Sequence, residues 1–119
     1  MPERMSSLPS DGSRGGDAEV AVLLITFPDA DVARELSGSL VEEGLVACVN
    51  LVGGVESIYR WDGALQRDSE VLGIAKVRRD RIEEVSRVVI ERHPYDVPEV
   101  IALPVAGGNP AYLEWVAGA

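Results

Sequence analysis

The stretch from His93 to Glu99, HPYDVPE, gathers the side-chain types that most often carry chemistry. It holds an imidazole, a phenol and two carboxylates within seven residues, and its two prolines stiffen the backbone. In one interpretation His93 and Glu99 contact a cation or exchange a proton. In the other, His93 simply ends a helix, where an imidazole bonds to the backbone or to a carboxylate.

Cys48 and Lys76 are each the only residue of their type, and both fall in apolar, strand-like runs. A cysteine there usually packs as a small hydrophobe, but a thiolate also binds soft metals such as Cu(I). A lysine on a strand normally faces solvent or guards an edge, whereas inside a cleft it holds an anion. Glu70 lies on the same face as Lys76 only if no bulge interrupts the strand between them.

Tyr59 and Trp61 point to one face of their strand by alternation. On a projecting hairpin, aromatic side chains anchor an interface or stack on a ligand, and both uses stay open. The chain has no GxGxxG, P-loop, CxxC, HExxH or GxSxG motif, and no local signature supports a Cys–His nucleophile pair. No standard catalytic motif therefore points to an enzyme.

One small domain has to position these side chains. The chain has 119 residues and a net charge of −9, which disfavours binding to nucleic acids or acidic membranes. Its polar residues 1–17 read as a disordered tail, and residues 18–119 as the domain. Neither a membrane span nor an apolar signal segment is evident, and one cysteine needs no oxidising compartment, so a cytoplasmic location is expected.

The first half of the domain reads as strand, helix and strand. Glu19 to Phe27 is apolar and β-branched, Asp29 is placed to cap a helix, and Gly44 is placed to end it. A second strand is expected from Leu45, with a bend or bulge at Gly53–Gly54. It continues through Val55 to Trp61.

The second half begins with the strongest turn signal, Asp62–Gly63, and a return strand from about Leu65 to Val77. Asp80 and Glu83 resemble a capping box for a second helix that ends near Arg92. A short strand, VIALPV, follows, and Asn109–Pro110 opens a last helix.

This β-α-β-β-α-β order with an extra C-terminal helix predicts an α+β, ferredoxin-like sandwich with helices on one face of the sheet. The hairpin arms, roughly a dozen residues each, are about 40 Å long, more than a core of this size can cover. Together with the open sheet face, this excess predicts association with further copies of the same chain.

Four segments in order, TFPDADVARELSGSLVEEGLVACVN, SIYRWDG, HPYDVPE and YLEWV, resemble the CutA family of divalent-cation tolerance proteins. The resemblance runs from about Val20 to Val116. It implies a fold similar to that of PII signalling proteins and a homotrimer in which the long hairpins wrap around neighbouring subunits. It also implies a non-enzymatic role in the response to copper or another divalent cation.

The copper ligands proposed for the family are a cysteine at the end of the first strand and a His-His pair before the Pro-Tyr motif. Here these positions are Ile25, Arg92 and His93, so His93 alone keeps a metal-binding side chain. In an assembled trimer, Glu99 or Cys48 of another chain would have to complete a site.

The resulting expectation is a homotrimeric binding or regulatory protein of the metal-ion response. The alternative is a PII-like trimeric signalling or scaffold protein that binds a small molecule or a protein without metal. In either case the site is expected in a cleft between subunits. The residues expected to line it are Cys48, Tyr59, Trp61, Lys76, His93, Tyr95 and Glu99.

Overall fold

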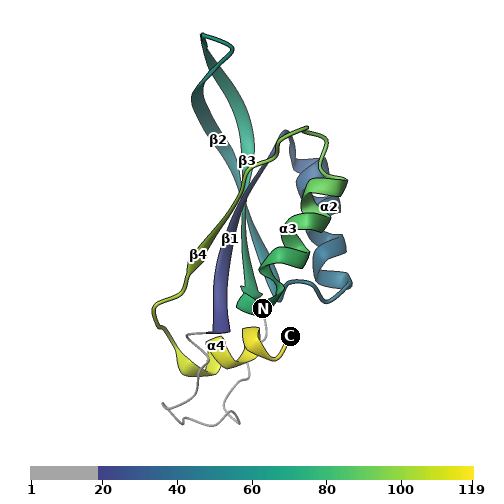
Figure 1. Ribbon diagram of the computed structural model, residues 1–119, viewed down its shortest axis with the longest axis vertical. Coiled ribbons are helices and arrows are strands. Elements are labelled where there is room, and N and C mark those ends of the chain that lie inside the picture. Colours follow the sequence, from purple (N-terminus) through teal and green to yellow (C-terminus); the bar gives the residue numbers. More distant parts are fainter. Residues whose placement is uncertain (1–18) are drawn as a thin grey trace.

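Four antiparallel strands form one sheet in the order β2-β3-β1-β4 in a computed structural model that describes residues 19–119 (Figure 1). This is the strand order of the predicted ferredoxin-like fold, which is thereby confirmed. The predicted tail, residues 1–17, lies outside the described residues. The elements are β1 (Val20–Phe27), α2 (Ala30–Glu42), β2 (Cys48–Trp61), β3 (Ala64–Arg78), a 3-10 turn η1 (Arg79–Arg81), α3 (Ile82–Arg92), β4 (Val100–Pro104) and α4 (Pro110–Ala117).

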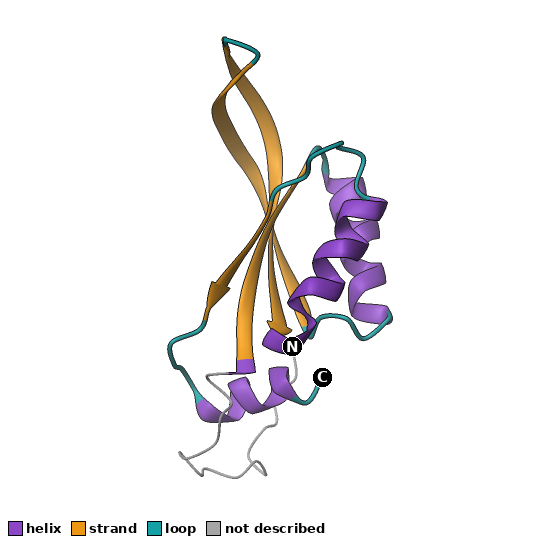
Figure 2. Ribbon diagram, viewed as in Figure 1, coloured by secondary structure: helices purple, strands orange, loops and turns teal. Residues whose placement is uncertain are grey.

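The main core lies between the sheet and the helices α2 and α3, which cover one of its faces (Figure 2). Alternate residues of the central strand β1, namely Leu23, Ile25 and Phe27, are fully buried there. Gly73 of β3 pairs with Ile25 and leaves room for the ring of Phe27. A Cβ at Gly73 would lie 2.8 Å from Cε2 of Phe27, so a side chain there would collide with the core.

The caps of α2 are those that the sequence predicts. Asp29 accepts the backbone N–H of Val32 at 2.8 Å, and Gly44 adopts a left-handed φ of 73° just after the helix. The capping box predicted for α3 is wrong. Asp80 instead accepts two hydrogen bonds from the Arg78 guanidinium, at 3.1 and 2.6 Å, within a 3-10 turn, and α3 begins only at Ile82.

The hairpin β2–β3 extends well beyond the core and makes the molecule 52 Å long (Figure 1). Asp62 and Gly63 form its tip, both with positive φ, so the predicted two-residue turn is confirmed. The predicted bulge is also present, as a register shift between Val52 and Val55. Strand β2 begins at Cys48 rather than Leu45, because Leu45 and the next residue are buried in the connection from α2.

The other face of the sheet is only partly covered. Helix α4 packs across its base, where Val20, Leu113 and Val116 form a second small core. Above α4 this face, which we call the open face, is apolar, and no helix or loop within residues 19–119 covers it. Its apolar side chains are Val22, Leu24, Val52, Leu72, Ile74, Ile101 and Leu103, of which Val52, Ile101 and Leu103 are between 43% and 48% exposed. Within residues 19–119 no helix is both long and apolar enough to span a membrane.

Candidate functional site

A pocket of about 460 Å³ lies where the hairpin leaves the core sheet. It is formed by the end of β1, the outer halves of β2 and β3, and the loop that joins α3 to β4. We call it the acidic pocket. Its lining residues are Thr26, Tyr59, Trp61, Asp68, Glu70, Tyr95, Asp96, Val97 and Glu99.

Two tyrosines connect the pocket's walls to its carboxylates. The Tyr59 hydroxyl donates to Asp68 across the hairpin, and the Tyr95 hydroxyl donates to Glu70 at 2.8 Å. The bond to Asp68 raises the pKa of Tyr59, while burial and then the bond to Glu70 raise that of Tyr95. Both phenols therefore stay protonated at neutral pH and hold Asp68 and Glu70 in place.

The remaining polar groups of the pocket have no partners among the residues that the structure describes. Asp96 and Glu99 make no ion pair or hydrogen bond there, and no Lys, Arg or His lines the pocket. Strand alternation places the Thr26 side chain on the pocket side of β1, where it is only 8% exposed. Its hydroxyl also has no hydrogen-bond partner within residues 19–119.

His93 lies beneath the pocket wall and is 7% exposed. Its Nε2 is 2.8 Å from the carbonyl oxygen of Thr26, and its Nδ1 accepts the backbone N–H of Tyr95 at 3.1 Å. Because a carbonyl only accepts and an N–H only donates, the ring carries its proton on Nε2 and is neutral. Both ring nitrogens are thus engaged, and the ring also stacks on Phe27 at a centroid distance of 5.6 Å.

Cys48 and Lys76 lie away from the acidic pocket of their own chain. They face each other across β2 and β3, at the opposite end of β2 from Trp61. The Cys48 thiol is 3.5 Å from the Tyr112 hydroxyl of α4, and Lys76 donates to the side-chain carbonyl of Asn50. Lys76 and Glu70 do share a face, because the bulge falls in β2 and leaves β3 regular.

Of the seven residues expected to share a cleft, one chain therefore brings four together, and His93 supports them from behind. The cleft expected from the sequence did not include five of the lining residues: Thr26, Asp68, Glu70, Asp96 and Val97. A signal for two of them was present. The two-residue turn at Asp62–Gly63 fixes the hairpin register, and counting from it places Asp68 and Glu70 on the face of Tyr59 and Trp61.

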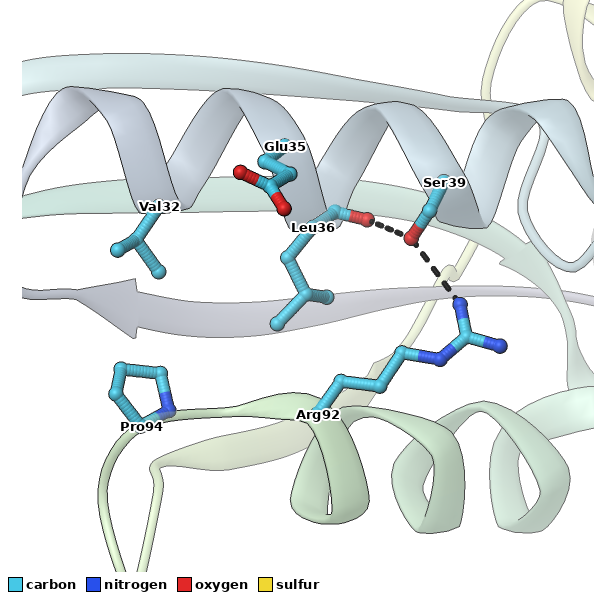
Figure 3. Close-up of a pocket in the computed structure, with 6 residues that line it drawn as sticks. All are labelled: Val32, Glu35, Leu36, Ser39, Arg92 and Pro94. Atoms are coloured by element: carbon cyan, nitrogen blue, oxygen red, sulfur yellow. Dashed lines mark hydrogen bonds between the residues drawn. The ribbon is translucent and has the colours of Figure 1, made fainter.

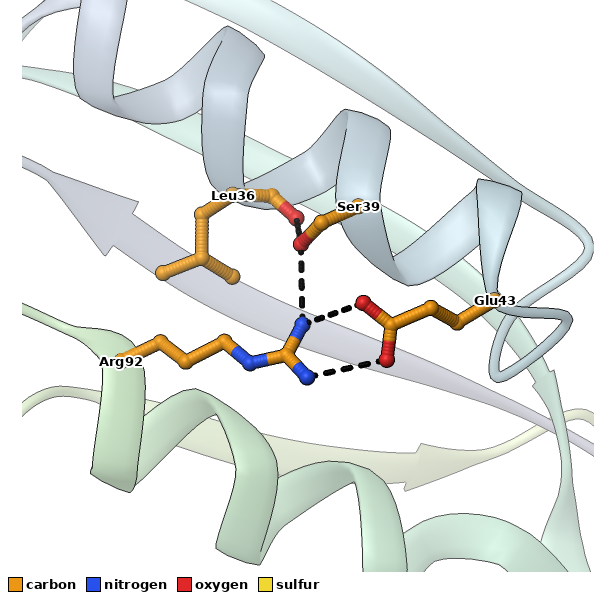
Figure 4. Close-up of polar contacts among 4 residues, drawn as sticks. All are labelled: Leu36, Ser39, Glu43 and Arg92. Carbon is orange, nitrogen blue, oxygen red and sulfur yellow. Dashed lines mark hydrogen bonds and ion pairs between the residues drawn. The ribbon is translucent and has the colours of Figure 1, made fainter.

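A second pocket, of about 520 Å³, lies between α2 and α3 (Figure 3). Its polar end is occupied by Arg92, which donates to both carboxylate oxygens of Glu43, at 2.7 and 2.9 Å, and to Ser39 at 3.1 Å (Figure 4). The bond to Arg92 lowers the pKa of Glu43. Because this guanidinium is already paired, Arg92 joins the two helices rather than presenting a charge to a ligand.

The three family copper positions do not fit copper within one chain. Ile25 is fully buried and has no ligand atom, Arg92 is paired with Glu43, and His93 uses both nitrogens. Throughout the described part of the chain, no three or more His, Cys, Asp or Glu side chains are grouped so that they could hold a metal ion.

Fold and site together define an α+β, ferredoxin-like protein with an open apolar sheet face and an acidic pocket at the root of a long hairpin. The profile of the CutA1 divalent ion tolerance protein family matches residues 21–119, and the chain belongs to this family. The family is named for tolerance of divalent ions.

Individual relatives agree with this assignment. The chain is 47% identical to the divalent-cation tolerance protein CutA of Thermus thermophilus over 80% of its own length and 92% of that protein. It is 48% identical to the chloroplastic protein CutA of Arabidopsis thaliana, but spans only about half of that protein's length (52%). The crystal structure of CutA1 from Oryza sativa superimposes with a TM-score of 0.82 at 45% identity, over 84% of this chain and 92% of that one.

Proposed function

We propose that this chain works in the cytoplasm as a homotrimeric, non-enzymatic binding protein in the response to divalent cations. The observation that carries this proposal is the open face of the sheet. It presents seven apolar side chains, next to a hairpin too long for its own core to cover. A face of this kind is stabilised only when another surface excludes water from it.

A second copy of the chain is the occupant that fits both features. The hairpin carries exposed apolar side chains of its own on the face opposite the acidic pocket, Ile58 and Leu65, which are 57% and 63% exposed. In a closed ring each hairpin covers a neighbour, so every copy gains burial from the same two surfaces. The resemblance to the CutA family implies three copies in such a ring.

The metal-ion part of the proposal rests on assembly. Since one chain does not group the ligands for copper, Cys48, His93 and Glu99 of different subunits would have to meet, and His93 would have to release one backbone partner. Copper is the cation that the family resemblance implies, and the same reasoning applies to other divalent ions.

Native mass spectrometry of the full chain, with and without Cu(II), tests this proposal. We expect a trimer, and we expect Ile101→Lys on the open face to dissociate it. Ile90→Lys is the matched control, because Ile90 is similarly exposed (54% against 48%) but lies on α3. A monomeric wild-type protein, or equal dissociation by both variants, would contradict the assembly.

Copper uptake is read from the same spectra. A fixed number of ions per trimer, lost in Cys48→Ala or Glu99→Gln, supports a metal site shared between subunits. A trimer that takes up no copper contradicts this metal-ion part and leaves the assembly intact.

A second candidate function, a PII-like trimeric protein that signals by binding a small molecule, is favoured by the acidic pocket. Its volume of about 460 Å³ lies within the range of organic ligand sites, and aromatic rings form part of its wall.

A further inference from the structure

We propose that the acidic pocket binds an aliphatic amine that carries two or more ammonium groups. This inference rests on the second candidate function and names the class of ligand that the pocket takes. It is carried by three features of the pocket: its charge, its aromatic and apolar walls, and the unpartnered hydroxyl of Thr26.

The charge of the pocket selects a cation. Four carboxylates, Asp68, Glu70, Asp96 and Glu99, line it, and no cationic side chain does. Asp68 and Glu70 each accept one hydrogen bond from a tyrosine, which leaves further lone pairs on their oxygens, and Asp96 and Glu99 are wholly unpartnered by described residues. The net charge of −9 adds a long-range field that draws cations toward such a cleft.

The walls of the pocket suit an organic cation. Trp61 and Val97, 64% and 79% exposed, offer apolar surface for a methylene chain. The indole face of Trp61 also attracts an ammonium group through its quadrupole, more strongly than the ring of Tyr or Phe does. The pocket therefore pairs apolar contact with charge, and a linear amine presents both along its length.

Thr26 supplies an independent polar contact at the inner end of the pocket. The residue is only 8% exposed, lines the pocket, and has no hydrogen-bond partner among residues 19–119. Its hydroxyl oxygen is not among the fully buried unpartnered atoms of the described residues, so it remains open to the pocket and free to accept a hydrogen bond. An ammonium N–H that enters the pocket would donate to this oxygen, at the end of the cleft nearest the core.

A bare metal ion fits these features less well. Divalent ions need several oxygen ligands within about 2.0–2.6 Å of one point, and the described carboxylates are not grouped in that way. A cavity of about 460 Å³ also leaves an inorganic ion mostly surrounded by water. Several ammonium groups on one flexible chain can instead reach several separated carboxylates.

Isothermal titration calorimetry of the full chain with spermidine tests the inference, with Mg²⁺ as a second titrant. The pocket variants are Glu99→Gln and Asp96→Asn, which remove unpartnered charges, and Trp61→Leu, which keeps apolar bulk but removes the indole. The control is Glu56→Gln, which removes the same charge from the opposite face of the hairpin. Circular dichroism verifies that each variant is folded.

We expect saturable binding of spermidine that weakens about tenfold or more in each carboxylate variant, as for the loss of one charge-assisted hydrogen bond. Trp61→Leu should weaken it several-fold, and Glu56→Gln should leave it unchanged. No binding by the folded protein, equal weakening by Glu56→Gln, or displacement of spermidine by an equal concentration of Mg²⁺ would each overturn the inference. Native mass spectra of the same samples report assembly separately, so a trimer that ignores spermidine refutes only the ligand class.

Discussion

The Nε2 atom of His93 lies 2.8 Å from the carbonyl oxygen of Thr26 and thereby ties the loop after α3 to the central strand. Through Nδ1 the same ring holds the backbone N–H of Tyr95, whose hydroxyl holds Glu70. One buried imidazole thus aligns two walls of the acidic pocket without lining it. The geometry accounts for a histidine at this position without any metal.

His93→Ala should therefore destabilise the protein even when a chelator has removed all metal ions. The change leaves a buried carbonyl and an N–H without partners and opens a cavity beside Phe27, at a combined cost of about 2–4 kcal/mol. Urea unfolding in EDTA measures this cost. His93→Gln retains a donor for Thr26 and should lose less. If both variants match the wild-type protein without metal and differ from it only with copper, His93 is a ligand instead.

Gly73→Ala should cost about 1–3 kcal/mol through overpacking. The new methyl group would lie 2.8 Å from the ring of Phe27, which is fully buried in the core. Gly53→Ala is the matched control on the neighbouring strand, because a Cβ there meets nothing within 4 Å. Thermal unfolding of both variants measures the difference, and an equal shift in Tm would show that packing against Phe27 is not the cause.

The Arg92–Glu43 ion pair should stabilise the folded protein at neutral pH and lose this effect in acid. Arg92 lowers the pKa of Glu43 below its ordinary 4.5, so the contribution is fully present above that value and disappears as pH falls through the lowered pKa. Glu43→Gln should consequently reduce Tm slightly at neutral pH and converge with the wild-type protein in acid. A constant difference between the two across the acidic range would contradict this linkage. Arg92→Lys, which cannot form both bonds, should behave in the same way.

All three tyrosines should ionise above their ordinary pKa of 10 in the folded protein. Burial and then the bond to Cys48 raise the pKa of Tyr112 to about 12, while burial and then the bond to Glu70 raise that of Tyr95. Because the folded state favours the protonated phenols, stability should decline as pH rises above 10. Titration of phenolate absorbance tests this, and Glu70→Gln should lower the pKa of one tyrosine, Tyr95. An unchanged titration curve in that variant would place Tyr95 outside the influence of Glu70.

Local signals predicted most of the fold. Asp29, Gly44 and the pair Asp62–Gly63 act through their immediate backbone neighbours, so their roles can be read from spacing alone. The cap at Asp80 could not be read in this way, because Arg78 competes for the same carboxylate once β3 ends beside it. The predicted start of β2 at Leu45 was wrong. Leu45 is apolar because it is buried in the connection after α2, and it does not pair in the sheet.

Only the residues of the acidic pocket that lie in segments of distinctive composition could be predicted from the sequence. Tyr59, Trp61, Tyr95 and Glu99 lie in two segments whose composition stands out, and both segments reach the acidic pocket. Thr26 looks like any strand residue, and only its place at the end of β1 brings it to the pocket. Cys48 and Lys76 were grouped with the others by residue type, yet strand length places them at the far end of the hairpin.

The extra residue at Gly53–Gly54 has a consequence for how this family of sites can change over time. Before the bulge, even-numbered residues of β2 share the open face, and after it odd-numbered residues do, including Tyr59 and Trp61. Because two residues of β2 stand opposite Val71 alone, losing one of their codons would restore regular alternation, and Val55 would still pair with Glu70. Tyr59 and Trp61 would keep their face beside Asp68 and Glu70. A codon lost between Val55 and Trp61 would instead turn the residues on one side of it to the opposite face. The bulge is thus a point at which the length of β2 can change by one residue without turning the aromatic pair away from the acidic pocket.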